Sequence, residues 1–549
     1  MKKILILTLA LLMLLGTLAA CNTPSPDLPE EQTTTQDTES TQQTTTQDTE
    51  NTPPTTDEVT TQPEPEQELE IRPATPPECA QTPEQIVENL TADLTVMQTG
   101  SRTKEVILPL QEADNVAEAF TLAGYAVAKP FALEGAKFEN IIFYSTECTV
   151  TLQKTANSAY LFWEPYSADA LDLLFTNNAT NTGEVIAAQI GVEREEETDN
   201  PMIGMCYVYK LSDGSAVIID GGVNTKACRN NILATLQRMD IAKDNAGRYR
   251  ITAWVLTHGH SDHRGAIVGF GKNYGDQVSL SYLVYNFPLG ELSTSTWDLL
   301  AFEEKMAKFY PDAQYVAPHA GLQYHFDNLT VQVLYSPELI YSPDQPVEYY
   351  NNTSLIFIAD CAGARILHMG DAGELASTAT WELYEKSAFG ANVLQITHHG
   401  LYTGPDSHKW KNLKNIYSAS QATLGLLPMG SRKPGDSRNG RHTVLIGWGG
   451  ANYQVSFVIN KRDNHGQSSI SQEYYEQFVA QVAAGTAQHQ TLFGYDGINT
   501  VTNDDGMITY LSCNETTPMV TLITLSAQGA SIAHNQMLYD WFADTATAD

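Results

Sequence analysis

Short apolar runs that end in glycine-rich polar turns dominate the chain from about residue 187 onward. Apolar positions at 206–210 and 216–219 flank Asp213-Gly214, a dipeptide typical of a tight hairpin turn. Another apolar run, at 251–256, is predicted to be a buried strand. This pattern predicts that the main folded region begins near residue 187.

A smaller folded region is predicted over residues 85–186. The apolar spacing predicts a helix over 116–126. Period-two alternation predicts strands at 141–143, 149–153 and 160–163. No cluster of histidine, cysteine or carboxylate side chains stands out here, so we expect a small α+β accessory domain that serves packing.

The first 21 residues have the pattern of an export signal. A basic start is followed by an apolar run over 4–15, which is too short to span a membrane. Leu18-Ala19-Ala20-Cys21 resembles the lipobox of bacterial lipoproteins. The resemblance implies that Cys21 carries a lipid and anchors the chain to the outer face of the cell membrane. No later stretch of about 20 apolar residues predicts a membrane span.

Residues 22–84 are rich in Thr, Gln, Pro and acidic residues, with near-repeats at 33–39 and 44–50. Such a segment cannot bury enough apolar surface to become ordered, so we predict a disordered stalk.

The whole chain carries 31 basic and 65 acidic residues, a net charge of -34. This acidity argues against a nucleic-acid-coating protein without excluding nucleic acid as a substrate. The six cysteines other than Cys21 lack a C-x-x-C pair and are expected to be mostly small buried residues, with a Cys79–Cys148 bridge left open.

Three histidines and one aspartate follow the strand at 251–256 within six residues: His258, His260, Asp262 and His263. In extended backbone, His258 and His260 point to the same side, so both imidazoles can bind one ion. Asp262 and His263 come after the chain turns towards a helix and can serve a neighbouring ion. Because imidazole and carboxylate suit zinc or manganese, this cluster predicts a two-metal site.

This H-x-H-x-D-H pattern resembles the signature of the metallo-β-lactamase superfamily. Further segments fit that family: Ile218-Ile219-Asp220-Gly221-Gly222, Asn351-Asn352-Thr353-Ser354, Gly370-Asp371 after a strand, and His398-His399-Gly400 after the strand at 393–397. The combination is most similar to the hydrolase domain of ComEC-type competence proteins and to teichoic acid phosphorylcholine esterases. The resemblance implies an α/β fold, the αββα sandwich, over residues 187–515. It also implies an insertion at 455–495, a closing hairpin at 497–512 and a C-terminal tail at 516–549.

The resemblance also implies a ligand set. One ion would take His258, His260 and one member of the His398/His399 pair. The other would take Asp262, His263 and His442, with Asp371 between the two ions. Either histidine of the pair can ligate; His399 is favoured, with His398 facing the substrate oxyanion. Asp220 is expected to support the metal loop.

The remaining histidines are assigned no metal. His368 is expected to be a packed residue within a strand. Loop or solvated positions are expected for the others: His319, His325, His408, His465, His489 and His534.

The chemistry implied is metal-dependent hydrolysis of a phosphodiester or related ester, on a small or cell-envelope substrate. Two divalent ions, zinc or alternatively manganese, activate water and stabilise an oxyanion, with Asp262, Asp371 and His398 as catalytic residues. No G-x-S-x-G nucleophile motif is present. Three alternatives stay open: a single-strand nuclease of the competence type, a β-lactamase or lactonase, and a non-catalytic surface-binding lipoprotein.

Overall fold

The computed structural model describes most of the chain between residues 75 and 533. The described residues are 75–90, 94–176, 183–190, 204–293, 298–400, 411–422, 424–428, 454–459, 509–512, 521–527 and 529–533. All of them belong to one compact unit, Glu70–Asp549. The predicted signal peptide, Cys21 and His442 lie outside the described residues.

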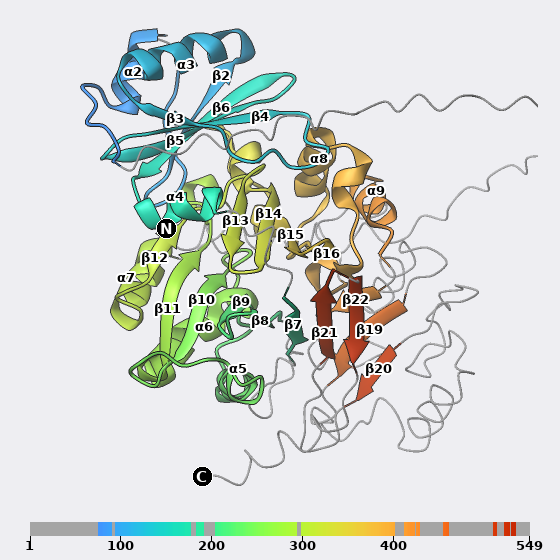
Figure 1. Cartoon of the computed structure of the whole chain (residues 1–549). Coiled ribbons are helices and arrows are strands. Elements are labelled where there is room, and N and C mark those ends of the chain that lie inside the picture. Colours follow the sequence, from blue (N-terminus) through green and yellow to red (C-terminus); the bar gives the residue numbers. More distant parts are fainter. Residues whose placement is uncertain are drawn as a thin grey trace, which may run out of the picture. The chain divides into compact units, whose positions relative to one another are not determined.

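The first sheet, called the accessory sheet below, is six-stranded and antiparallel (Figure 1). In spatial order its strands are β1 (Met97–Gln98), β2 (Lys104–Pro109), β6 (Ser158–Pro165), β5 (Cys148–Lys154), β4 (Glu139–Tyr144) and β3 (Ala126–Ala128). Helices α2 (Pro83–Leu90) and α3 (Ala113–Leu122) cover one face, where Phe120, Val150 and Leu161 belong to one apolar cluster. The α+β character predicted for this region is therefore observed.

Helix α3 ends earlier than the predicted 116–126. Tyr125 N donates to Phe120 O over 3.1 Å, and Gly124 adopts φ +91°. A glycine in this left-handed conformation ends a helix, because the chain must turn away to close the last backbone hydrogen bonds. Residues from Ala126 onward can then join the sheet as β3.

The second sheet has eight strands and is mixed. In spatial order they are β12 (Gln314–Val316), β11 (Val278–Val284), β10 (Tyr249–Val255), β9 (Ala216–Ile219), β8 (Tyr207–Lys210), β7 (Val185–Gln189), β21 (Thr521–Ser526) and β22 (Gly529–Ala533). Strands β9 to β12 run parallel. The predicted hairpin around Asp213-Gly214 is confirmed as the antiparallel pair β8–β9, with Gly214 at φ +78°.

The third sheet also has eight strands. In spatial order they are β13 (Gln323–Phe326), β14 (Leu329–Tyr335), β15 (Ile356–Cys361), β16 (Ala364–His368), β17 (Val393–Gln395), β18 (Leu424–Leu427), β19 (Gln454–Ile459) and β20 (Thr509–Ser512). Strands β16 to β20 run parallel.

The second and third sheets pack face to face on one apolar core. Residues such as Tyr207, Val217, Phe357 and Ile366, from both sheets, form this core. Three helices cover the outer face of the second sheet: α5 (Lys226–Arg238), α6 (Ser261–Tyr274) and α7 (Leu299–Phe309). Two cover the outer face of the third: α8 (Glu374–Leu383) and α9 (Lys411–Ser420). The predicted αββα sandwich is therefore confirmed.

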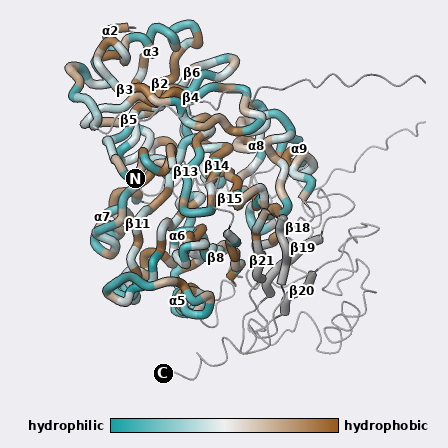
Figure 2. The backbone as a smooth tube through the Cα atoms, in the orientation of Figure 1, coloured by the Kyte–Doolittle hydropathy of each residue, from teal (hydrophilic) through white to brown (hydrophobic). Residues whose placement is uncertain are grey.

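Burial of apolar surface explains this layering. Figure 2 shows hydrophobic colour gathered along the strands and hydrophilic colour on the outer turns of α5 and α7.

His368, at the end of β16, is a packed core residue as predicted. It is fully buried, its Nε2 lies 2.6 Å from Tyr209 Oη, and its ring stacks on Phe357.

The boundaries of the sandwich differ from the predicted 187–515. Strand β7 begins at Val185, and β21, within the predicted tail, pairs with it near one end of the second sheet, where β22 is the edge strand (Figure 1). Strand β19 lies in the third sheet, so an insertion cannot begin at 455. Strand β20 pairs in parallel with β19, whereas the first part of the predicted hairpin at 497–512 lies outside the described residues.

The folded region also begins before residue 85. Thr146 N donates to Pro77 O over 2.9 Å, and α2 starts at Pro83.

Among the described cysteines, Cys148, Cys206, Cys228 and Cys361 are buried as expected, and Cys79 and Cys148 are free thiols. None of the described helices is long and apolar enough to cross a membrane.

The position of β21 leads to a prediction about truncation. Ile523 and Leu525 are 1% and 0% exposed in the central core. Since burying one such side chain contributes about 1.5–3 kcal/mol, deleting residues 516–549 is expected to lower the free energy of unfolding by about 3–6 kcal/mol. Urea unfolding measures this loss, and deletion of 537–549 alone is the control. Equal stability of the two truncated chains would contradict the placement of β21 in the sheet.

Candidate metal centre

Four strand ends bring the candidate site together at one edge of the sandwich. Asp220 follows β9, and His258 follows β10, in the second sheet; Asp371 follows β16, and His399 follows β17, in the third. Within each pair the two strands run parallel, so their carboxyl ends meet at the same edge. Leu355 N donates to Thr257 O over 2.9 Å and joins the two sheets beside the site.

The H-x-H-x-D-H segment spans the turn from β10 into α6. His260 is the extended residue that precedes the helix, and Asp262 lies in its first turn. A carboxylate there is stabilised by the positive end of the helix dipole. His258 Nε2 and His260 Nδ1 lie 3.0 Å apart, as expected for two imidazoles that point to the same side.

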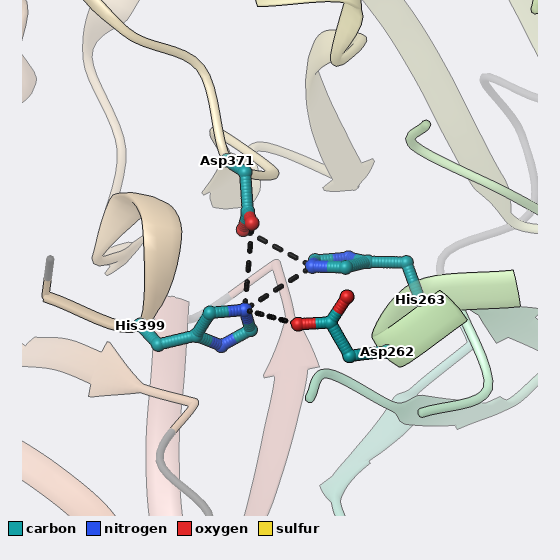
Figure 3. Close-up of side chains that lie close together, drawn as sticks. All are labelled: Asp262, His263, Asp371 and His399. Atoms are coloured by element: carbon teal, nitrogen blue, oxygen red, sulfur yellow. Dashed lines mark hydrogen bonds and ion pairs between the residues drawn. The ribbon is translucent and has the colours of Figure 1, made fainter. Parts of the chain in front are cut away.

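One group of possible metal ligands contains Asp262, His263, Asp371 and His399 (Figure 3). His263 Nε2 lies 3.1 Å from Asp371 Oδ1 and 3.2 Å from His399 Nε2. His399 Nε2 lies 3.4 Å from both Asp262 Oδ2 and Asp371 Oδ2. Figure 3 shows these four side chains converging from opposite sides on one small volume.

A second group contains His258, His260 and again Asp371. His258 Nε2 lies 3.7 Å from Asp371 Oδ2. Within each group the donor atoms lie within 4.8 Å of one another. The structure thus brings together six of the eight residues predicted as ligands, and Asp371 belongs to both groups.

The grouping of His399 differs from the predicted one. His399 lies with Asp262 and His263 rather than with His258 and His260. Two causes are visible: His398 and His399 both adopt the left-handed conformation, and His399 Nδ1 donates to Pro428 O over 2.7 Å. Together they turn His399 Nε2 towards α6. His398 belongs to neither group, and its Nε2 lies 3.9 Å from Asp371 Oδ2.

The backbone that carries these ligands is strained. His398 and His399 have φ values of 47° and 52°, a region that non-glycine residues rarely adopt. Gly370 has φ +51°, and a Cβ there would lie 2.9 Å from Ser354 Cβ and 3.1 Å from Thr257 Cβ. Only glycine fits this position, and such strain is typical of functional sites.

Hydrogen bonds behind the ligands hold the rings in place. Asp220 Oδ2 accepts from His263 Nδ1 over 2.6 Å, and Asp220 Oδ1 accepts from Thr257 N over 2.7 Å. Asp371 N donates to Ser354 Oγ over 3.1 Å. Since its Nδ1 is engaged, His263 can present only Nε2 to the group shown in Figure 3. The predicted supporting residue Asp220 therefore lies directly behind a candidate ligand.

The site is electrostatically suited to cations. Burial and the neighbouring His263 hold the pKa of His258 well below its usual value, so its imidazole is neutral. Burial also disfavours charge on Asp371 and on His399. Nevertheless, the surrounding histidines hold the pKa of Asp371 well below its usual value, and Asp371 and Asp262 raise the pKa of His399 to about 9.

The donor atoms fit a metal ion. Asp371 Oδ1 is buried, and its contact with His263 Nε2 at 3.1 Å is an ion pair without hydrogen-bond geometry. Protons on His263 and His399 balance the negative charge of the buried carboxylates. Divalent ions can replace these protons, because metal binding releases protons from the ligands. The residues present fit a metal site made of nitrogen and oxygen donors.

Several residues of the site carry no clear signal in the sequence. Tyr350 lies with its ring 5.0 Å from that of His260, and the preceding Tyr349 has φ 56°. Their position just before the Asn351-Asn352 motif is the one clue. His319 lies in a loop as expected, but it is buried and pairs with Glu338. His325, expected in a loop or in solvent, is instead buried in β13. Burial could not be foreseen because the carboxylate partner of His319 comes from another segment.

Residues 199–416 match the family model of the Metallo-beta-lactamase superfamily. This range contains every residue of the two donor groups. The chain therefore contains a metallo-beta-lactamase superfamily domain, which in general terms implies a metal-dependent hydrolase.

The solved structures that are similar to this chain include the following two. The metallo-beta-lactamase fold protein YhfI from Bacillus subtilis has 13% sequence identity and a TM-score of 0.30, over 50% of this chain and 96% of that chain. DIM-1 metallo-beta-lactamase has 15% identity and a TM-score of 0.21, over 44% of this chain and 91% of that chain. No curated protein sequence matches the chain significantly. Likenesses at these TM-scores assign no role to individual residues.

The hydrogen bond between Asp220 and His263 gives a testable expectation. Asp220→Asn is expected to weaken metal binding by about 10–100-fold, because the amide no longer fixes the tautomer and orientation of His263. Competition with a chromogenic chelator measures the affinity. Asp240→Asn is the matched control, since Asp240 is exposed and also has a positive φ of 51°. Unchanged affinity in the Asp220 variant would assign that residue to folding alone.

Proposed function

We propose that the metallo-beta-lactamase superfamily domain of this chain holds two neighbouring divalent ions and hydrolyses esters, with phosphodiesters as the preferred class. Asp371 carries this proposal, since its carboxylate belongs to both groups of donor atoms. A carboxylate has two oxygens, each able to serve a different ion. A buried carboxylate in that position supports a dinuclear centre over a single ion.

The donor groups define how the ions would be held. One would take Asp262, His263, Asp371 and His399; the other would take His258, His260 and Asp371. Zinc suits these donors, with manganese as the alternative. When bound, such ions supply an activated water and stabilise negative charge at the attacked centre. His442 stays a predicted ligand.

The chain's own side chains have separate tasks in this reaction. Asp371 accepts a hydrogen bond from the attacking water and orients it. The His398 side chain is 16% exposed, so it can reach substrate. Burial lowers the pKa of His398 to about 4, so its neutral imidazole donates one hydrogen bond to the oxygen that gains negative charge. Asp262 is also partly exposed, with 18% of its side chain accessible to solvent.

Charge supports a small substrate over a long polyanion. The chain has a net charge of -34, which opposes the approach of DNA. This repulsion is screened beyond about 8 Å at physiological salt. Bound ions dominate the field inside the site, so a single phosphodiester group can still bind there. The resemblance of Asp371 and His398-His399-Gly400 to the phosphodiesterase-like branch supports the same substrate class.

Metal content and substrate preference test the proposal together. Protein purified without chelator is expected to contain two transition-metal ions per chain. It should cleave bis-nitrophenyl phosphate or nitrophenyl phosphorylcholine with a higher kcat/KM than single-stranded DNA or a chromogenic cephalosporin. Asp371→Asn should lower the rate by more than about 100-fold, since it weakens a direct ligand. Asp344→Asn, at an exposed position, is the control.

The possible outcomes separate the alternatives. Fastest cleavage of single-stranded DNA would favour the competence-type nuclease, and fastest cleavage of the cephalosporin would favour a β-lactamase. Trace metal together with chelator-insensitive turnover would overturn the metal-dependent mechanism. No turnover of any substrate by the metal-loaded protein would favour the surface-binding lipoprotein.

We also propose that a lipid on Cys21 holds the protein at the outer face of the cell membrane. The support is the lipobox-like Leu18-Ala19-Ala20-Cys21 after a short apolar run. Cys21→Ala is expected to release the protein from the membrane fraction, as measured by fractionation and blotting. Cys79→Ala should leave it attached, and persistent attachment of the Cys21 variant would point to another anchor.

A further inference from the structure

A second concave site lies where the accessory sheet meets the sandwich. It is a cavity of about 130 Å³, bounded by β5 and β6 of the accessory sheet, by the end of β12 and by α4 (Ala168–Phe175). Figure 1 shows α4 between the accessory sheet and the strands β12 and β13. None of its lining residues belongs to the two donor groups, so this cavity is separate from the candidate metal centre.

The floor of the cavity is a buried charged histidine. His319 is 2% exposed; its Nδ1 lies 2.8 Å from Glu338 Oε1 and its Nε2 lies 3.8 Å from Glu164 Oε1. Phe162 of β6 stacks on the ring, with centroids 5.0 Å apart. Burial lowers the pKa of His319, but the two carboxylates outweigh it and raise the pKa to about 10. The His319 ring is therefore protonated at neutral pH.

The charges of the carboxylates near His319 are not all neutralised. Glu338 is fully buried, and His319 holds its pKa below the usual value, so these two charges neutralise each other. Glu105 is also fully buried, and burial together with Glu338 raises its pKa well above the usual value, so it is neutral. Glu164, whose side chain is 21% exposed and lies 3.8 Å from His319 Nε2, shares this one histidine with Glu338, so the three groups together keep one net negative charge at the cavity wall.

A positive charge faces the same cavity from its rim. The Arg102 guanidinium lies over the Tyr315 ring, 5.0 Å from its centroid. Among the described residues, Arg102 makes no hydrogen bond or ion pair, and it does not pair with Glu164 although both line the cavity. The cavity is thus lined by one guanidinium and one carboxylate that do not pair with each other.

We propose that this cavity binds a small zwitterion of the amino-acid class, with its ammonium group at Glu164 and its carboxylate at Arg102. The size agrees, because a cavity of roughly 150 Å³ accommodates a benzene-sized molecule. Tyr166, Tyr315 and Tyr324 line the walls, and tyrosine faces stabilise an ammonium group. Leu171 and Leu174 give an apolar surface for a short side chain.

Calorimetric titration of the full chain with alanine and valine tests this assignment. Both are expected to bind, whereas N-acetylalanine, without an ammonium group, and alaninamide, without a carboxylate, should each bind at least tenfold more weakly. Glu164→Gln and Arg102→Gln should each weaken alanine binding at least tenfold. Glu139→Gln, on the neighbouring strand β4 and outside the cavity, is the control.

Two variants are used so that the test remains valid if one of them fails to fold. Arg102 is exposed and makes no hydrogen bond or ion pair among the described residues, so its replacement leaves the His319–Glu164 contact intact. Circular dichroism and thermal unfolding establish that both variants are folded. Absence of alanine and valine binding at 10 mM, equal binding of the two blocked analogues, or binding unchanged in both variants would each overturn the proposal. Hydrolytic activity is not part of the measurement, so failure here leaves the proposed hydrolase untouched.

Discussion

The geometry of the site depends on one buried carboxylate surrounded by imidazoles. Asp371 is 1% exposed, and ring nitrogens of His258, His263, His398 and His399 lie between 3.1 and 3.9 Å from its oxygens. A buried carboxylate is costly unless it is paired, so these positions are strongly constrained. The strained turn at Gly370, the left-handed histidines and the hydrogen bonds that Asp220 and Ser354 accept all serve to keep this arrangement.

The sandwich makes this arrangement possible by placing strand ends from distant segments at one edge. Parallel pairs in each sheet, β9–β10 and β16–β17, carry their polar ends to the same place. Large apolar residues between the sheets then hold the two halves of the site in register. Strands β7 and β21, from the two ends of the domain, pair with each other in the second sheet. The stability of the site therefore depends on residues far from it in the sequence.

The accessory sheet is packed against the sandwich rather than merely linked to it. Ile142 and Tyr144 of β4 belong to the same apolar core as Val331 and Phe357 of the third sheet. Gln153 Nε2 donates to Ala320 O over 2.8 Å, beside the buried pair His319–Glu338. This region was predicted to serve packing, and its contacts agree; they also form the walls of a cavity with charges of both signs.

The sequence alone determined the local features of this protein. The H-x-H-x-D-H segment predicted which residues would lie together, because four ligands within six residues are positioned by one strand end and one helix start. The hairpin at Asp213-Gly214 and the αββα layering were predictable for the same reason, since turn chemistry and family motifs are local in the chain. Only the tertiary structure decided which donor group His399 joins, because that depends on two left-handed residues and on Pro428 O from a neighbouring strand end. It alone placed β21 beside β7 and buried His319 against Glu338, since pairing between distant segments leaves no periodic trace in either.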